Sequence, residues 1–320
     1  RATGLYKLPP FHSIHKRRAV HSILSLFDKC GALMRQTLLY NEVYFSDFFL
    51  LAEALLSIPS EKLKNLTLWL LYREPPNVLS RHRKRLLQIH HQLHVHLKGQ
   101  ICFLAEGDRQ CQILGEYFDR NFSVLPIPHG FQESFIKTKP SELPLCVCYG
   151  PARPGYHPMR KGVDILQRIL DKRLYGAPPP FALVAADDSG LQPQPDGVPL
   201  YIFSSKLSRE DYYKWIARGD LAIFPYQQEY YDYYTSGIFI EAVTAGVPVL
   251  VQERTWLGRQ CQHYGGEHCV IDWRQMDPFD VIKDCIQNGQ KASQALIDGV
   301  RKVHTSKGFA NFVLVNYLQR

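Results

Sequence analysis

The chain has 320 residues, of which 45% are hydrophobic and 21% charged, a composition typical of a globular protein long enough for two domains. No apolar run approaches the roughly 18 residues that a bilayer-spanning helix needs, and no secretory leader pattern opens the chain, which disfavours an integral membrane or secreted protein. The formal net charge of +8 arises in residues 1–140, which hold 19 Lys and Arg against 11 Asp and Glu, while residues 141–320 are neutral.

Strand-like and helix-like runs alternate along the chain, which is the pattern of parallel sheets with helices on both faces. In the first half we predict helices near 16–30, 47–58, 78–95 and 109–118, with strands over Thr37–Phe45, Leu66–Tyr72, Gln100–Ala105 and Ser123–Ile127. In the second half we predict strands near 145–149, 182–186, 200–203, 222–224, 247–251 and 269–271, with helices between most of them. One of these helices is predicted to begin with Ser208 as N-cap, because an acid, Asp211, follows three residues later. The fold class is therefore α/β, with two Rossmann-type parallel-sheet domains.

Residues 126–144 hold four prolines and no periodic pattern, which indicates a linker. We place the domain boundary near 140, so that residues 1–140 form the first domain and residues 141–305 the second. The stretch Gly308–Leu318 predicts a helix with an apolar face, within a last segment of residues 306–320.

Cysteine usage bears on the cellular compartment and on metal binding. The eight cysteines are irregularly spaced, and three of them fall in predicted strands, namely Cys102, Cys146 and Cys148. Buried thiols of this kind are typical of a reducing compartment, so we expect a cytoplasmic protein. The nearest approach to a metal motif is the set Cys261, His263, His268 and Cys269. Its spacing fits no zinc pattern well, and no metal site is expected.

The basic first half predicts an anionic partner. Its most basic stretch is Arg81–Arg85, which is followed by His90, His91, His94 and His96 on the same predicted helix. This helix could contact the anionic inner face of a membrane or hold a phosphorylated acceptor, and a solvated charged surface is the ordinary alternative. Nucleic acid is disfavoured because no aromatic residues are interleaved with the basic ones.

Two loops in the second half contain candidate anion-binding residues. In the first loop, Gly150 and Arg153 follow a strand, and Arg160 and Lys161 precede a helix that begins at about Gly162. Cations at a helix N-terminus oppose the helix dipole, so their presence makes sense if an anion lies between them and the exposed N–H groups. The alternative is that both side chains simply point into water.

The second loop leads into a helix that starts at Thr235 or Ser236 as N-cap. Backbone N–H groups of Ser236, Gly237 and Ile238 could bind a phosphate, and Gly237 permits close approach. Glu241 lies about a turn and a half further on an otherwise apolar helix, where a buried carboxylate needs a polar partner. A glutamate on the outer face of the helix is the alternative.

These residues resemble the nucleotide-sugar half of family-4 (group 1) glycosyltransferases of the GT-B fold. The family has a glycine-rich loop with an Arg and a Lys-Gly pair, which match Gly150, Arg153, Lys161 and Gly162. It then has an E-x7-E element and Gly-x-Pro-Val, which match Glu241, as the second glutamate, and Gly246, Pro248 and Val249. The likeness spans residues 145–305, and the first domain is similar in outline only. One departure stands out, since Tyr233 occupies the position of the first family glutamate, which contacts the transferred sugar.

The resemblance implies a retaining glycosyltransferase with two domains facing a cleft, a UDP- or GDP-sugar as donor and a glycan or lipid-linked acceptor bound by the first domain. It implies neither a metal nor a cofactor besides the nucleoside diphosphate sugar. Lys161, Arg153 and Glu241 would be catalytic, and the donor-binding residues would be Gly150, Arg160, Lys206, Leu207, Tyr233, Ser236, Gly237 and Ile238.

Three further expectations accompany the resemblance. The last segment, residues 306–320, would cross back to the first domain. Weaker candidates for the cleft are His129 and Arg73–Pro75, and for His129 a structural role in a hinge-side loop of the first domain is favoured. Tyr233, together with a first domain that looks incomplete at its start, leaves open a degenerate binding or scaffold protein.

Overall fold

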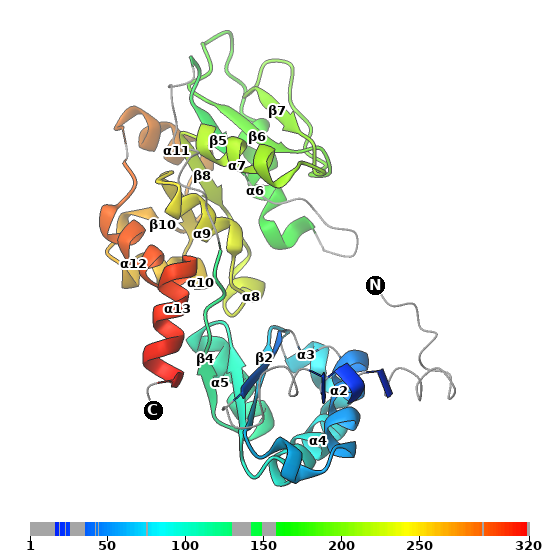
Figure 1. The fold of residues 1–320 in the computed structure, drawn as a ribbon. Coiled ribbons are helices and arrows are strands. Elements are labelled where there is room, and N and C mark those ends of the chain that lie inside the picture. The colour runs from blue at the N-terminus through cyan, green and yellow to red at the C-terminus, as the bar shows by residue number, and fades with distance from the viewer. Residues whose placement is uncertain are drawn as a thin grey trace. The chain divides into compact units, whose positions relative to one another are not determined.

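The computed structural model describes residues 17–25 without 19 and 23, 36–129 without 42, 44 and 75, 142–148, and 158–318 without 290. The chain divides into two compact units, Arg1–Leu125 and Pro126–Arg320, and each is built around a parallel sheet (Figure 1). The predicted α/β fold class is confirmed. The division precedes the predicted boundary near 140, because the stretch that ends at His129 hydrogen bonds to a helix of the second unit, as shown below.

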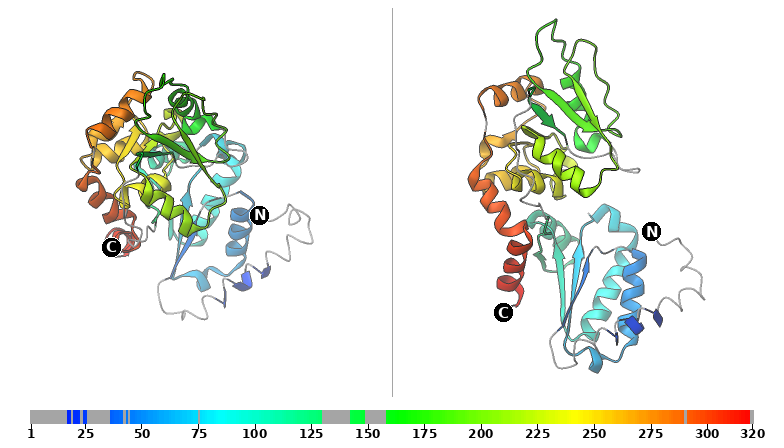
Figure 2. Two further views of the ribbon diagram at one scale, coloured as in Figure 1. Left: turned by 90° about the horizontal axis from the view of Figure 1, so that it is seen from above. Right: turned by 45° about the horizontal axis from the view of Figure 1, so that its top comes forward.

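The first unit has a four-stranded parallel sheet in the order β1-β2-β3-β4. Its strands are β1 (Gln36–Asn41), β2 (Leu66–Tyr72), β3 (Ile101–Ala105) and β4 (Phe122–Val124). The crossovers contain α2 (Phe45–Ser57), α3 (Pro76–Leu79), α4 (Arg83–His96) and α5 (Asp108–Phe118), with short 3-10 turns at Ser60–Leu63 and Ser80–His82. Because each strand pairs with the next in sequence, right-handed crossovers put these helices on one face. Figure 2 shows α2 and α4 packed on that face, over a core that includes Phe48, Leu70 and Leu93.

The second unit has a six-stranded parallel sheet in the order β10-β9-β8-β5-β6-β7. The strands are β5 (Leu145–Val147), β6 (Ala182–Ala186), β7 (Leu200–Phe203), β8 (Leu221–Phe224), β9 (Val249–Gln252) and β10 (Val270–Ile271). The helices are α6 (Val163–Leu170), α7 (Arg209–Arg218), α8 (Gln228–Tyr231), α9 (Gly237–Thr244), α10 (Trp256–His263), α11 (Pro278–Gln287), α12 (Gln294–His304) and α13 (Ser306–Val313). This strand order is that of a doubly wound sheet, in which the winding direction reverses between β5 and β8.

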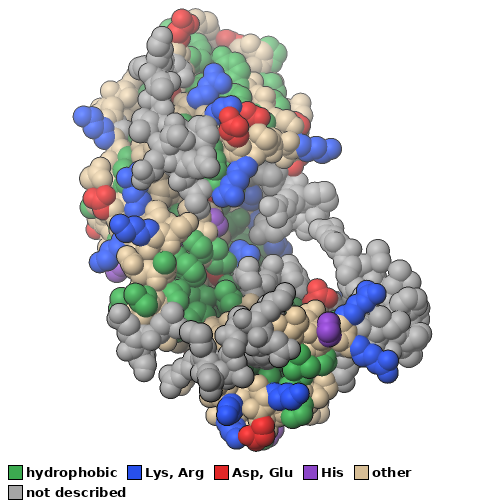
Figure 3. All heavy atoms as spheres, in the orientation of Figure 1, with side chains coloured by type: hydrophobic (Ala, Val, Ile, Leu, Met, Phe, Trp, Pro, Cys, Tyr) green, Lys and Arg blue, Asp and Glu red, His purple; other side chains and the backbone are tan. Residues whose placement is uncertain are grey.

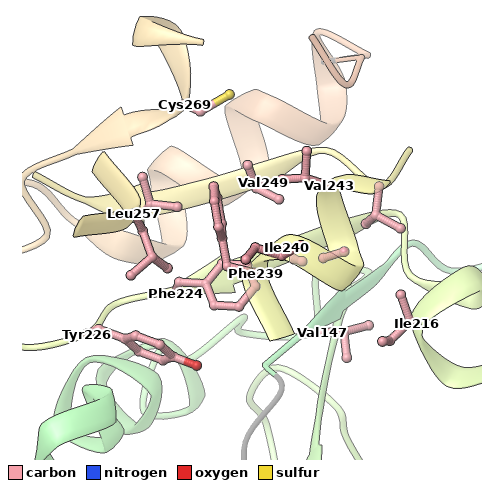
Figure 4. Packing of buried hydrophobic residues seen from close by; sticks show 14 of the residues in the cluster. Val147, Ile216, Phe224, Tyr226, Phe239, Ile240, Val243, Val249, Leu257 and Cys269 are labelled. Carbon is pink, nitrogen blue, oxygen red and sulfur yellow. The ribbon is translucent and has the colours of Figure 1, made fainter. Parts of the chain in front are cut away.

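Helix α9 is anchored in the core of the second unit (Figure 4). Phe239 is fully buried and its ring lies edge-on to Phe224 of β8, with centroids 5.8 Å apart. Ile240 and Val243 also point into this core, beside Val249 of β9. The apolar side of α9 therefore fixes the helix on the sheet, and its N-terminus is held at the end of β8.

The predicted helix starts in this unit are confirmed. Ser208 is the N-cap of α7, and its hydroxyl accepts a hydrogen bond from the backbone N–H of Asp211. Ser236 is the N-cap of α9, and its hydroxyl accepts from the N–H of Phe239. Short polar side chains at these positions satisfy helix N–H groups that have no partner within the helix. Both helices therefore begin where local sequence dictates.

The predicted strands are confirmed, and several are shorter than expected. The strand predicted over Ser123–Ile127 ends at Val124, and the one predicted over Thr37–Phe45 ends at Asn41. Pro126 and Pro128 have no N–H group to continue the β4 ladder, and Phe45 already begins α2. No helix in the described part of the chain is long and apolar enough to cross a membrane.

Candidate functional site

The site lies at the carboxyl ends of β5 and β8, the central strands of the second sheet. These strands pair in parallel, with Cys146 opposite Leu221 and Val147 opposite Ala222. In open α/β sheets ligands bind where the winding reverses, beyond the carboxyl ends of the strands. The chain leaves β5 and β8 through the two loops that contain the candidate anion-binding residues, so the topology brings the ends of both loops to one edge of the sheet.

The loop after β5 ends in a 3-10 turn, Pro158–Lys161, followed by Gly162 as the N-cap of α6. Gly162 adopts a left-handed conformation with φ +71°, and a Cβ atom at this position would overlap the carbonyl oxygen of Pro225, just after β8. The predicted Gly150 and Arg153 lie outside the described residues. The turn that carries Arg160 and Lys161 is thus pressed onto the end of β8 at a position where only glycine fits.

Arg160 joins the two loops. Its carbonyl oxygen accepts a hydrogen bond from the N–H of Gln227 at 2.9 Å, and its guanidinium carbon lies 4.3 Å from the centroid of the Tyr230 ring. A guanidinium stacked on a tyrosine face gains a cation–π interaction. Its side chain is therefore positioned by the loop after β8.

Lys161 is half-buried and lies close to the end of β5. Burial raises the pKa of the Cys148 thiol to about 12, and the positive charge of Lys161 acts in the opposite direction. An electrostatic effect of Lys161 on Cys148 requires the ammonium group to be near the residue that follows β5. The lysine predicted to bind an anion is therefore at the strand end where a ligand would lie.

The loop after β8 contains Tyr233, which replaces the first family glutamate. The two nearest carboxylates in sequence do not take over that position, because each forms an ion pair elsewhere. Asp232 Oδ1 lies 2.7 Å from Arg259 Nη1, and Glu229 Oε1 lies 2.9 Å from Arg274 Nη2. Both acids are therefore paired with arginines from later elements of the second unit.

A pocket of about 520 Å³ opens beside α9. Four residues predicted to bind the donor line it together: Leu207, Gly237, Ile238 and Glu241. The other lining residues are His129, Phe203, Ser204, Ser205, Arg209 and Tyr212. Apolar walls with a few convergent polar groups are typical of small-molecule sites. The structure therefore brings the second predicted loop, the helix carrying Glu241 and the segment before α7 to one cavity.

Among the described residues that line this pocket, Glu241 is the only carboxylate. Its Oε2 accepts a hydrogen bond from the Tyr212 hydroxyl at 2.8 Å. Burial raises the pKa of Glu241 above its usual value, while the Tyr212 hydrogen bond and the positive charge of Arg209 act to lower it. The alternative of a glutamate on the outer face of the helix is thereby excluded.

His129 belongs to the second unit, not to the first as predicted. Its N–H donates to the carbonyl oxygen of His304 at 2.8 Å, and His304 Nδ1 donates back to the carbonyl oxygen of Ile127 at 3.1 Å. A Cβ atom on Gly237 would overlap the His129 ring. The close approach that Gly237 permits at the start of α9 is therefore to a histidine ring at the wall of the pocket.

Other candidates lie apart from the pocket lining. The Lys206 side chain is exposed, and its backbone N–H donates to Ser204 Oγ. Arg73 forms an ion pair with Glu106 inside the first unit. The described residues include no cluster of three or more His, Cys, Asp or Glu side chains placed to hold a metal ion.

Sequence reasoning missed Arg209 and Tyr212. They lie three residues apart in the first turn of α7, on the side that faces α9. The cap at Ser208 fixed the start of this helix, so the i, i+3 spacing was a usable signal that both side chains share a face. The sequence did not show that this face of α7 packs against α9.

No known family model matches this sequence, and no curated protein matches it. Among solved structures it is similar to sucrose-phosphate synthase from Thermosynechococcus elongatus, at 13% identity over 94% of this chain and 76% of that chain, with a TM-score of 0.58. It is also similar to the UDP-forming α,α-trehalose-phosphate synthase from Burkholderia vietnamiensis, at 12% identity over 96% of this chain and 80% of that one, with a TM-score of 0.57.

A third similar structure is an E. coli protein, named as trehalose-6-phosphate bound with UDP-2-fluoro glucose. It is 10% identical over 96% of this chain and 78% of that chain, with a TM-score of 0.58. At identities this low, the likeness establishes a shared fold. It confirms two Rossmann-type parallel-sheet units of the kind found in GT-B glycosyltransferases. The narrower assignment to family 4 stays a prediction.

Proposed function

We propose that this chain is a glycosyltransferase that transfers a sugar from a nucleoside diphosphate sugar, with UDP or GDP as the leaving group. The observation that carries the proposal is the pocket beside α9, where Glu241, Gly237 and Ile238 of the helix after β8 meet Leu207 of the segment before α7. In this proposal Glu241 accepts a hydrogen bond from the ribose, and the N-terminus of α9 binds phosphate.

The proposed chemistry depends on charge that develops on the diphosphate as the glycosidic bond breaks. In this proposal Lys161 and Arg160 supply positive charge on the β5 side, and the N–H groups of Gly237 and Ile238 supply donors on the β8 side. Groups placed in advance where charge grows lower the barrier more than they stabilise the bound donor. The proposed mechanism uses no metal ion. We also propose that the anomeric configuration is retained, as the resemblance to family-4 glycosyltransferases implies.

The names of two similar structures mention UDP, which agrees with the proposed nucleoside diphosphate sugar donor. One is a UDP-forming synthase, and another contains UDP-2-fluoro glucose. Both share the fold of this chain. We do not assign the acceptor substrates of these proteins to this chain, because acceptor contacts depend on side chains that differ at such low identity.

A degenerate, non-catalytic nucleotide-sugar binder is the second candidate. It is favoured by Tyr233, which has no carboxylate, and by the ion pairs of Asp232 with Arg259 and of Glu229 with Arg274. In such a protein the nucleotide would bind through Glu241 and α9, but the sugar would lack its acidic partner. Binding and turnover therefore separate the two candidates.

We expect calorimetric titration of the full chain to show binding of UDP or GDP, because Glu241 and the N-terminus of α9 line one pocket. A glycosyltransferase will in addition hydrolyse the matching nucleoside diphosphate sugar slowly in the absence of acceptor. Binding without any hydrolysis supports the scaffold. Absence of binding by UDP, GDP and their sugar conjugates contradicts both.

We further propose that the first unit approaches an anionic membrane surface or a lipid-linked acceptor at the cytoplasmic face. Residues 75–105 contain no Asp or Glu, while Arg81 is exposed in the turn before α4, and Lys84 and Arg85 are exposed in its first turn. The face drawn in Figure 3 shows Lys and Arg side chains scattered among other residue types. A diffuse surface of this kind favours peripheral contact rather than a deep phosphate pocket.

We expect the chain to sediment with vesicles that contain phosphatidylglycerol at low salt and to dissociate as salt is raised, since exposed charges are screened beyond about 10 Å at 0.1 M salt. Neutral phosphatidylcholine vesicles serve as the control. Arg81→Gln combined with Lys84→Gln should weaken the binding several-fold. Equal binding to both vesicle types would contradict the electrostatic contact.

A further inference from the structure

The carboxylate of Glu241 presents its two oxygens differently. Oε2 accepts the hydrogen bond from the Tyr212 hydroxyl at 2.8 Å. Within the described residues no donor reaches Oε1, although Glu241 lines the pocket beside α9. A half-buried carboxylate oxygen with no protein donor is satisfied by solvent or by a ligand hydroxyl. The arrangement therefore leaves one acceptor open to a bound molecule.

Tyr212 is itself held in place by α7. It lies one turn after the N-cap Ser208, it packs against the core of the second unit, and its ring lies 5.7 Å from that of Tyr213. Arg209, one turn earlier, donates from Nε to the Tyr213 hydroxyl at 2.9 Å. Helix α7 thus presents a hydroxyl donor and a cation to α9 from a fixed position, and the donor hydrogen bond fixes the orientation of the carboxylate.

We propose that Tyr212 is a positioning residue for nucleoside recognition: by holding Oε2 of Glu241, it directs Oε1 at a ribose hydroxyl and makes the pocket select ribonucleotides over their deoxy forms. This inference rests on the proposed nucleotide-binding function. Tyr212 does not itself need to touch the ligand. Its effect is to keep the open oxygen of Glu241 in one place.

Loss of the Tyr212 hydroxyl also changes the protonation of Glu241. The hydrogen bond from Tyr212 lowers the pKa of Glu241 against the effect of burial, so its removal lets the pKa rise. The other titratable or charged groups around this side chain are Arg209 on α7, His129 at the pocket wall and Arg301 on α12, which donates to the Thr244 carbonyl oxygen at the far end of α9. These groups are unchanged in a Tyr212→Phe variant.

The test compares dissociation constants of UDP, 2′-deoxy-UDP and 3′-deoxy-UDP by calorimetry in wild type, Tyr212→Phe and Tyr213→Phe. If GDP is the ligand that binds, the guanosine series replaces the uridine series. In wild type, removal of the hydroxyl that Glu241 accepts should weaken binding about 10- to 100-fold, as expected for a hydrogen bond to a charged group. In Tyr212→Phe this ratio should fall to about 3-fold or less.

Tyr213→Phe is the matched control, because it removes a neighbouring hydroxyl that contacts Arg209 and not Glu241. It should keep the wild-type ratio. A second readout is the ratio of the two dissociation constants as a function of pH, in which protonation of the phosphate, common to both nucleotides, cancels. Discrimination is lost as pH falls through the pKa of Glu241, so in Tyr212→Phe the loss should begin at higher pH than in wild type.

The possible failures can be told apart. If wild type binds none of the nucleotides, the proposed function is wrong and the inference falls with it. If wild type binds UDP and Tyr212→Phe keeps both the ratio and its pH dependence, the function stands and the positioning role is overturned. If both tyrosine variants lose discrimination equally, the effect belongs to the packing of α7, and the inference is likewise overturned.

Discussion

Replacement of Gly162 by alanine is expected to lower the free energy of unfolding of the second unit by about 3 kcal/mol or more. The left-handed backbone at φ +71° costs a non-glycine residue about 1–2 kcal/mol. The new Cβ would also overlap the Pro225 carbonyl oxygen, and overpacking of this kind costs about 1–3 kcal/mol. Pro225 lies between the end of β8 and the buried Tyr226, so its carbonyl group cannot move away without disturbing the core.

Chemical denaturation of the full chain, followed by circular dichroism, measures this loss. The control is Gly176→Ala, because Gly176 has φ +79° and no atom within 4 Å of an added Cβ. It isolates the cost of the backbone conformation and the effect of alanine on the unfolded chain, and about 1–2 kcal/mol is expected. Equal losses at the two positions would show that Gly162 is not required by the contact with Pro225.

Lys161→Ala is expected to weaken binding of the nucleoside diphosphate about 10- to 100-fold, because a hydrogen-bonded charge pair at a half-buried site is worth about 1.5–3 kcal/mol. Turnover of the donor sugar should fall further than binding, by about 100-fold or more, since charge on the leaving diphosphate is larger in the transition state. Calorimetry gives the first quantity, and hydrolysis of the nucleoside diphosphate sugar gives the second.

The control is Lys302→Ala, which removes an exposed lysine of α12 in the same unit. Binding should then change less than about 2-fold, because an exposed charge is largely screened. If both variants weaken binding equally, the effect is one of net charge and Lys161 does not face the diphosphate. A drop in affinity without any further drop in turnover would indicate ground-state binding only.

The local parts of the site could be predicted from the sequence. Ser208 and Ser236 were predicted as N-caps because a cap involves only residues two or three positions apart. Glu241 was singled out because one acid on an apolar helix is conspicuous. The strands were predictable too, but several end earlier than predicted, as at Val124 before Pro126 and at Asn41 before α2.

The tertiary pairings could not be predicted in the same way. Tyr212 and Glu241 are 29 residues apart, and their contact depends on how α7 packs beside α9. His129 and Gly237 lie on segments separated by most of the second unit, and the histidine was expected in the first. Neither periodicity nor composition encodes which helix faces which, because packing is decided by side-chain shape across the whole core.

The two sheets also differ in how far apart in sequence their paired strands lie. Every pair in the first unit joins consecutive strands, whereas the central pair of the second, β5 with β8, closes over 75 residues, as the hydrogen bond from Leu145 N–H to Asp220 shows. Contacts between distant segments form slowly because a long loop must first be ordered. The pocket beside α9 belongs to the unit that this pairing completes, so the proposed UDP binding is expected to recover with the slowest step of refolding rather than with an early one.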